Sequence, residues 1–151
     1  KRLKLLNALV STLPGLPVIY YGDEIGMPGG NDPDNRRMMR FDNLTDSEKL
    51  VKETTTKLLK FRRKAMPLIF GDIQVLQVSP NILVYKRTYL NEFVIVAINK
   101  SDADASISIK KDKTMKKEIV SSQFGNKLTD KDGALTINLP SHNFEIITNI
   151  K

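Results

Sequence analysis

The sequence predicts an α+β fold, with helices and one buried strand in the first half and an antiparallel β-sandwich in the second. Apolar residues recur at three- and four-residue steps before about residue 66 and at two-residue steps after Asp72. The 151 residues are too few for a complete (β/α)8 barrel, which takes about 250. With 40% hydrophobic and 27% charged residues, the composition is that of an ordinary globular chain, not of a fibre or a disordered tail.

The first segment predicts an amphipathic helix followed by a short buried strand. Apolar side chains recur at helical spacing over residues 1–13, until the breaker pair Pro14-Gly15 ends the pattern. The continuous apolar run 17–21 predicts a strand that is buried on both faces, as in a parallel sheet. A helix, a short turn and a buried strand in this order are typical of an α/β unit. The expected apolar stripe of the helix consists of Leu3, Leu6, Val10 and Leu13, with Leu5 and Leu9 alongside.

A long polar loop and a second helix complete the first half. The loop 22–43 is rich in Gly and Pro, and loops of this length are usually functional or disordered. Thr45 and Glu48 have the spacing of a capping box, which predicts a helix from there to about Ala65. Pro67 is expected to stop this helix. The predicted apolar face of this helix consists of Leu50, Thr54, Leu58, Phe61 and Ala65, with Val51 and Leu59 broadening it.

The second half predicts a sandwich of short strands. Turn residues separate apolar alternations that lie about ten residues apart, a spacing that favours an antiparallel sandwich. The boundary between the halves is placed at 68/69. The aromatic residues of the second half are expected in the sandwich core or at a sheet edge; they are Tyr85, Tyr89, Phe93, Phe124 and Phe144. The predicted strands are 73–78, 82–88, 93–99, 105–110, 116–121, 134–139 and 143–149.

Composition excludes several function classes. The chain has no Cys and one His, His142, which speaks against cysteine–zinc sites, His-rich metal sites and a Ser-His-Asp triad; no metal site is expected, and His142 is assigned to a turn. The net charge of +7 is spread over short basic clusters interrupted by acids, so a solvated surface is expected instead of a nucleic-acid interface. No apolar run reaches the roughly 18 residues of a membrane span. A start at Lys1 without an apolar leader predicts a piece of a longer protein.

The segment 20–36 carries the most specific functional signal. A buried strand that ends at Tyr21 would lead into a Gly-rich loop that holds Asp32, Asp34 and Arg36. The carboxyl ends of parallel strands are where α/β proteins place their sites. A carboxylate and a guanidinium four residues apart can present acceptors and donors together. This combination suits a ligand covered in hydroxyl groups, such as a sugar.

The runs YYGDEIGM at 20–27 and GGNDPDNR at 29–36 resemble the eighth strand and following loop of the α-amylase family. These glycoside hydrolases are built on a (β/α)8 barrel, and similar loops occur in neopullulanases and cyclomaltodextrinases. The resemblance extends over the whole chain. Residues 1–68 correspond to the C-terminal end of the barrel, with the end of helix 7, strand 8, the loop and helix 8. Residues 69–151 correspond to the β-sandwich called domain C.

The resemblance implies retaining hydrolysis of α-glucosidic bonds in starch, malto-oligosaccharides or cyclodextrins, by carboxyl groups about 5 Å apart. The family's catalytic Asp, Glu and Asp follow the fourth, fifth and seventh strands, so no catalytic residue is expected in this chain. The chain alone is therefore expected to be inactive. Hydrolysis and transglycosylation both stay open. No cofactor is implied for these residues, and any calcium ion would lie in the upstream part of the parent protein.

Asp32 and Arg36 match family positions that contact a glucose on the non-reducing side of the cut, which implies a substrate-binding role for both. The alternative is an internal ion pair that shapes the loop. Asp34 and Asn35 are expected to make turn hydrogen bonds instead of touching the ligand, and Arg37 could serve either purpose.

Other side chains near the motif are expected to be structural. Tyr20 and Tyr21 would pack in the barrel wall. Adjacent strand residues point to opposite faces, so Asp23 and Glu24 would not converge as a catalytic pair but would bond around the barrel end. The methionines of the loop would fill space beneath it; they are Met27, Met38 and Met39.

A different class of function is a non-catalytic carbohydrate-binding or docking module built on the sandwich. In either case, strand 8 and its helices would lack their barrel neighbours and expose an edge and apolar faces. Residues 1–66 are therefore expected to self-associate or to be held loosely.

Overall fold

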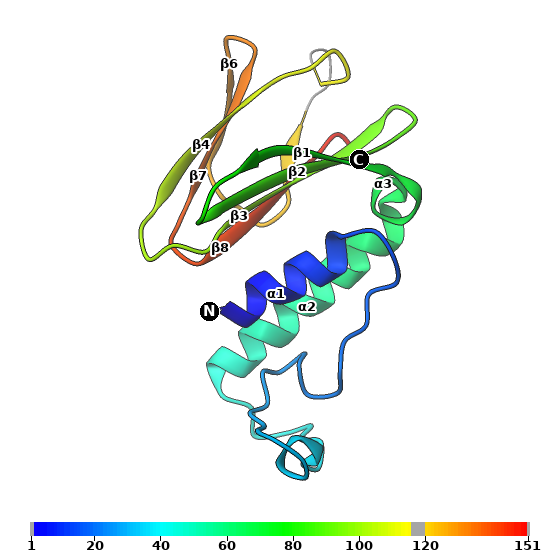
Figure 1. The fold of residues 1–151 in the computed structure, drawn as a ribbon, viewed down its shortest axis with the longest axis vertical. Coiled ribbons are helices and arrows are strands. Elements are labelled where there is room, and N and C mark those ends of the chain that lie inside the picture. Colours follow the sequence, from blue (N-terminus) through cyan, green and yellow to red (C-terminus); the bar gives the residue numbers. More distant parts are fainter. Residues whose placement is uncertain (1, 116–119, 151) are drawn as a thin grey trace.

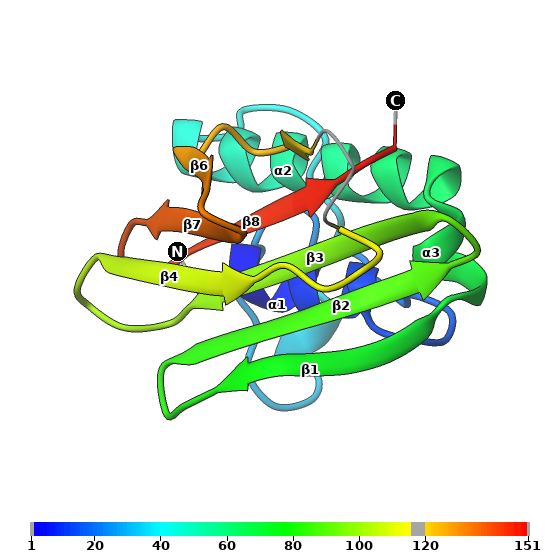
Figure 2. The same ribbon diagram turned by 90° about the horizontal axis from the view of Figure 1, so that it is seen from above.

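The computed structural model describes residues 2–115 and 120–150 and arranges them in three layers (Figures 1 and 2). A helical layer covers one face of a five-stranded antiparallel sheet, and a three-stranded antiparallel sheet covers the other face. The helices are α1 (Arg2–Thr12), α2 (Asp46–Lys64), α3 (Met66–Phe70) and the 3-10 helix η1 (Asp34–Arg36). The strands are β1 (Asp72–Val78), β2 (Ile82–Tyr89), β3 (Glu92–Asn99), β4 (Ala105–Lys110), β5 (Ser121–Ser122), β6 (Leu128–Lys131), β7 (Ala134–Leu139) and β8 (Asn143–Thr148).

The central strand β3 explains how the layers share a core. The larger sheet has the order β1-β2-β3-β8-β5 and the smaller one β4-β7-β6. Successive strand residues point to opposite faces, so Val94 and Val96 face the helices whereas Phe93 and Ile95 face the smaller sheet. All four are completely buried. The predicted antiparallel sandwich is thus confirmed, with a layer of helices added to one side.

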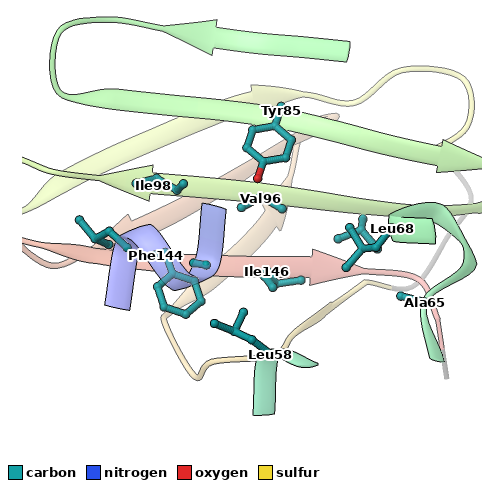
Figure 3. Packing of buried hydrophobic residues seen from close by; sticks show 11 residues of the cluster. Leu58, Ala65, Leu68, Tyr85, Val96, Ile98, Phe144 and Ile146 are labelled. Carbon is teal, nitrogen blue, oxygen red and sulfur yellow. The ribbon is translucent and has the colours of Figure 1, made fainter. Parts of the chain in front are cut away.

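The helix-side core joins the two halves of the chain (Figure 3). Leu58 from α2 packs with Phe144 and Ile146 from β8, and each has at most 1% of its surface exposed. Burial of side chains of this size contributes roughly 1.5–3 kcal/mol each. Residues before and after the predicted boundary therefore contribute to one continuous apolar cluster.

Two buried arginines anchor the end of α1. Arg62 donates hydrogen bonds to the carbonyls of Ser11 (2.9 Å), Leu13 and Gly15. These groups lack helical partners because α1 ends there, and a cation at a helix C-terminus is also favoured by the helix dipole. Arg87 from β2 donates to the carbonyl of Thr12 at 2.8 Å. The last turn of α1 is therefore bound to both α2 and the sheet.

Thr12 makes a second contact with the sheet through its hydroxyl group, which hydrogen-bonds the hydroxyl of Tyr85. Burial raises the pKa of Tyr85 to about 12, against the opposing effects of the Thr12 bond and of Arg87. The phenol therefore stays protonated and uncharged at all ordinary pH values.

The short helix α3 differs from the expectation that Pro67 ends the helical segment. Helix α2 ends at Lys64, and Pro67 lies in the first turn of α3, where its missing N–H group has no helical partner to lose. Gly71 follows and accepts two hydrogen bonds from Arg87 through its carbonyl. A Cβ atom at Gly71 would lie 2.4 Å from the carbonyl oxygen of Pro67, so only glycine fits.

The predicted apolar faces of α1 and α2 are confirmed in part. In the second helical segment Leu58 and Ala65 are buried and Phe61 packs against the same cluster, whereas Leu50 is 51% exposed. In α1 Leu6 is 53% exposed, and the buried apolar residues are Leu5, which lies beside the predicted stripe, and Ala8. The spacing thus indicates an apolar face, but the packed sheet decides which residues of that face are covered.

The strand predictions need three corrections. The expected buried strand 17–21 belongs to neither sheet, and Val18 is 79% exposed. A parallel strand needs neighbours for its backbone hydrogen bonds, and the described residues supply none. The strand Leu128–Lys131 was not expected, because its residues are mostly polar and exposed. Of the expected strand 116–121, residues 116–119 lie outside the described part, and β5 covers Ser121–Ser122.

Glu145 is a fully buried carboxylate in β8. Its Oε1 accepts hydrogen bonds from the backbone N–H groups of Gln123, Phe124 and Ile146, at 2.8–2.9 Å. Its Oε2 accepts from the backbone and the side-chain amide of Asn126. These five donors compensate for the burial of the charge, and they hold the turn 123–126 against β8.

Candidate functional site

The candidate site is the loop 22–43, which connects the segment after α1 to α2. In Figure 1 it lies beyond the helix pair, on the side away from the two sheets. Most of its side chains are exposed to solvent. The sandwich and the helices therefore act as a support from which this loop projects.

Asp32 and Arg36 form an ion pair, with 2.7 Å between Asp32 Oδ1 and Arg36 Nε. The 3-10 helix η1 brings them together, since Arg36 donates its backbone N–H to the carbonyl of Pro33. Their side chains remain 60% and 71% exposed, respectively. The two residues predicted to bind substrate are thus adjacent to each other and accessible, and they are also paired, as the alternative prediction expects.

Asp34 makes a separate set of contacts inside the loop. Its Oδ2 accepts a hydrogen bond from the backbone N–H of Gly30 at 2.7 Å. Its Oδ1 lies 2.7 Å from Arg37 Nε and 2.5 Å from Arg37 Nη2. Arg37 and then the Gly30 amide hold the pKa of Asp34 below its usual range. Asp34 therefore stays ionised and makes turn hydrogen bonds, as predicted.

Two neighbouring tyrosine rings, those of Tyr20 and Tyr21, precede the loop. The centroids of Tyr20 and Tyr21 are 4.7 Å apart with an interplanar angle of 43°. Partial desolvation and the neighbouring Tyr20 raise the pKa of Tyr21, and the charge of Arg36 acts in the opposite direction. The rings are 50% and 40% exposed, so the expectation that they pack in a wall is wrong for the chain as it folds here. Their exposure follows from the missing strand neighbours.

The start of the loop is ordered by its own polar groups. The Glu24 carboxylate accepts a hydrogen bond from the backbone N–H of Gly22 at 2.8 Å, so this carboxylate has the structural role predicted for it. Ile25 is buried beneath the turn. Met38 is 91% exposed, and the prediction that the methionines all fill space beneath the loop is wrong for this residue.

The exposed groups of the loop are of kinds that bind polar ligands. Asp32 and Arg36 present a carboxylate and a guanidinium to solvent, and Tyr20 and Tyr21 expose parts of their rings. Hydrolysis by a retaining glycosidase needs a carboxyl group that stays protonated near neutral pH. The pKa of Asp34 is shifted in the opposite direction.

Residues 2–115 and 120–150, the loop included, contain no cluster of His, Asp or Glu that could hold a metal ion. His142 Nε2 lies 2.7 Å from Asp102 Oδ1, a contact between two turns at one end of the sheets. No helix in the described ranges is long and apolar enough to cross a membrane.

Both halves of the chain are similar to known proteins of one family. Residues 71–147 match the family described as the α-amylase C-terminal domain. The cyclomaltodextrinase of Geobacillus thermopakistaniensis is 35% identical over 146 residues, which are 95% of this chain and 24% of the relative. The alignment thus includes the loop as well as the sandwich.

Solved structures show the same arrangement. An Anoxybacillus α-amylase superposes with a TM-score of 0.83 at 31% identity, over 99% of this chain and 32% of that protein. An α-amylase of Geobacillus thermoleovorans, solved with acarbose, gives a TM-score of 0.82 at 26% identity, over 99% of this chain and 33% of that protein. The chain spans about a quarter of its cyclomaltodextrinase relative and about a third of these two structures.

Proposed function

The chain belongs to the C-terminal region of the α-amylase family of glycoside hydrolases, comprising the end of the barrel and domain C, and we propose that it serves a retaining hydrolase of α-glucans. The substrate is starch, a malto-oligosaccharide or a cyclodextrin. The catalytic carboxyl groups come from parts of the enzyme outside these 151 residues. No cofactor or metal ion is assigned to the residues of this chain.

The exposed Asp32–Arg36 pair is the observation that carries the proposal. One carboxylate and one guanidinium at 2.7 Å can accept from and donate to neighbouring hydroxyl groups of one glucose unit. The likeness to a cyclomaltodextrinase, and to an α-amylase solved with acarbose, supports a sugar as the ligand. Both residues bind substrate in this proposal and neither is a catalytic residue.

A chimeric enzyme tests the role directly. Residues 1–151 replace the aligned region of the Geobacillus thermopakistaniensis cyclomaltodextrinase, and hydrolysis of maltoheptaose is measured. The chimera is expected to be active, whereas the chain alone is expected to release no product from a chromogenic maltoside. Turnover by the isolated chain would contradict the assignment of the catalytic groups to other parts of the enzyme.

The binding role of the pair is tested by Arg36→Ala and Asp32→Ala in the same chimera. Loss of hydrogen bonds between a charged group and a sugar is expected to raise KM about tenfold, because such bonds contribute roughly 1.5–3 kcal/mol each. Unchanged KM in both variants would show that the loop does not touch the substrate.

A carbohydrate-binding module is the second candidate, and one observation favours it. The ring centroids of Phe70, at the end of α3, and Tyr89, at the end of β2, lie 5.9 Å apart. The two residues are 67% and 37% exposed, respectively. Titration of the chain with maltoheptaose, followed by amide chemical shifts, separates the two roles. Shifts around Phe70 and Tyr89 favour the module, and shifts confined to 32–36 favour the enzyme.

The exposed apolar residues of the first half support a further proposal about assembly. Leu16 is 92% exposed, Val18 79% and Phe41 79%. In the intact enzyme, the rest of the barrel would cover these residues. In the isolated chain we expect self-association through residues 1–66, driven by burial of this surface.

A further inference from the structure

The loop contains two neighbouring ion pairs, Asp32–Arg36 and Asp34–Arg37, and their contacts differ. We propose that Asp34 is a positioning residue that holds Asp32 and Arg36 in place for the sugar without contacting it. This inference rests on the proposed function and deepens it, because it names the residue on which the substrate contact depends.

Asp34 has both carboxylate oxygens occupied within the loop. One oxygen binds the backbone N–H of Gly30 and the other binds two nitrogens of Arg37. Gly30 precedes the turn and Arg37 follows it, so a single side chain joins the chain entering η1 to the chain leaving it. Charge-assisted bonds of this kind are stronger than neutral ones, so a sugar hydroxyl would compete with strong internal partners for this carboxylate.

Close packing around the turn reinforces this connection. A Cβ atom at Gly29 would lie 3.1 Å from the Cα of Asn35, and one at Gly30 would lie 3.3 Å from Asp34 Oδ2. The glycines thus let the entering chain lie against η1. Among the described side chains, Asp34 is the one that bonds both the Gly30 amide and the guanidinium of Arg37.

Asp32 and Arg36 have the opposite character. Their contact uses Asp32 Oδ1 and Arg36 Nε. Among the described residues, Asp32 Oδ2 and the terminal nitrogens of Arg36 have no protein partner. These atoms supply an acceptor and several donors in a fixed arrangement, which is what recognition of adjacent sugar hydroxyls requires.

The test uses the chimera defined above, with maltoheptaose as substrate. Asp34→Ala is compared with Asp42→Ala, because both variants remove one carboxylate from the same loop and Asp42 makes no ion pair in the described part of the chain. Asp34→Ala is expected to raise KM between about threefold and tenfold with kcat nearly unchanged, since a binding contact is lost and the catalytic groups are not. Asp42→Ala is expected to leave both constants unchanged.

Adding Asp34→Ala to the variant Asp32→Ala/Arg36→Ala separates positioning from contact. If Asp34 acts only through Asp32 and Arg36, the triple variant has the KM of Asp32→Ala/Arg36→Ala. If Asp34→Ala raises KM further in that background, Asp34 contacts the sugar independently and the inference is overturned. An unchanged KM in Asp34→Ala, together with a raised KM in Arg36→Ala, overturns the inference and leaves the proposed function standing. Unchanged KM in both single variants overturns both.

A structural readout on the 151-residue chain completes the test. The amide resonance of Gly30 should shift in Asp34→Ala and remain in place in Asp42→Ala. The resonances of the sandwich, such as that of Val96, should not change in either variant. A Gly30 amide that is insensitive to Asp34→Ala contradicts the connection on which the inference depends.

Discussion

The guanidinium of Arg87 donates a 2.8 Å hydrogen bond to the main-chain carbonyl of Thr12, which lies 75 residues earlier in the sequence. The same guanidinium binds the carbonyl of Gly71 through two further nitrogens. Arg87 is 1% exposed. This contact joins β2 of the sandwich to the end of α1, from which the chain continues toward the loop. The sandwich therefore helps to fix the path of the loop that carries the candidate site.

Replacement of Arg87 by Met should lower the free energy of unfolding by about 3 kcal/mol, because two buried carbonyl groups lose their donors. Urea denaturation of the chain measures this loss. Arg63→Met, at an exposed position of α2, is the matched control and should change stability by less than about 0.5 kcal/mol. Equal stability of the two variants would contradict the role given to Arg87.

Glu145→Gln should also destabilise the chain, by roughly 2–3 kcal/mol, because the new amide group would face N–H donors that need an acceptor. Glu53→Gln, on the exposed face of α2, serves as the control. The loss should appear in urea denaturation and in shifted amide resonances at 123–126. A variant that leaves those resonances in place would show that Glu145 does not hold the turn.

The ion pair between Lys86 and Asp112 predicts an acid-dependent component of stability. Burial acts to raise the pKa of Asp112, but hydrogen bonds from Lys86 and Thr114 outweigh it and lower the pKa below its usual value. A carboxyl group with a lowered pKa in the folded state stabilises the fold above its unfolded pKa of about 4, and this contribution is lost as the pH falls through the folded value.

The measurement is urea denaturation between about pH 5 and pH 2. Asp112→Asn should reduce the slope of stability against pH in this window, whereas Asp42→Asn should not. Because Lys86 is buried, Asp112→Asn should also be less stable at neutral pH. Parallel pH curves for Asp112→Asn and the wild-type chain would contradict the prediction.

The exposed segment after α1 predicts concentration-dependent association of the isolated chain. Leu16→Ser/Val18→Ser removes two apolar side chains that are more than three-quarters exposed. Sedimentation velocity should show association of the wild-type chain that the double variant weakens. Lys52→Ser/Lys60→Ser on α2 is a control that should leave association unchanged. A wild-type chain that stays monomeric at high concentration would disprove this prediction.

The sandwich and the capping box could be predicted because their patterns are local. Alternation within β2, β3, β7 and β8 is visible in each strand's own residues, whether the partner is the next strand, as for β2 and β3, or a distant one, as for β3 and β8. Thr45 accepts from the backbone of Glu48, and the Glu48 carboxylate accepts from Thr45 in return, as the spacing predicts. The two-residue period of a strand and the three-residue spacing of a capping box each involve only a few neighbouring residues. Both can therefore be recognised without knowledge of the tertiary structure.

Residues 17–21 show where local patterns fail. The run is apolar and rich in strand-forming residues, yet it pairs with no strand in the described chain. A buried parallel strand exists only when other strands flank it, and the run itself contains no information about those strands. The exposure of Tyr20 and Tyr21 follows from the same cause.

The sequence by itself determined the fold class, the two-residue period of the sandwich and the Asp32–Arg36 motif that resembles a sugar-binding loop. Only the tertiary structure decided which residues of the predicted helix faces are buried, such as Leu58 and not Leu50, because a side chain is buried only where another element covers it. The tertiary structure also decided which aspartate pairs with which arginine in the loop. Asp34 and Asp32 are two residues apart and chemically identical, and the turn at η1 binds the Asp34 carboxylate to Gly30 and Arg37, whereas the Asp32 carboxylate pairs with Arg36.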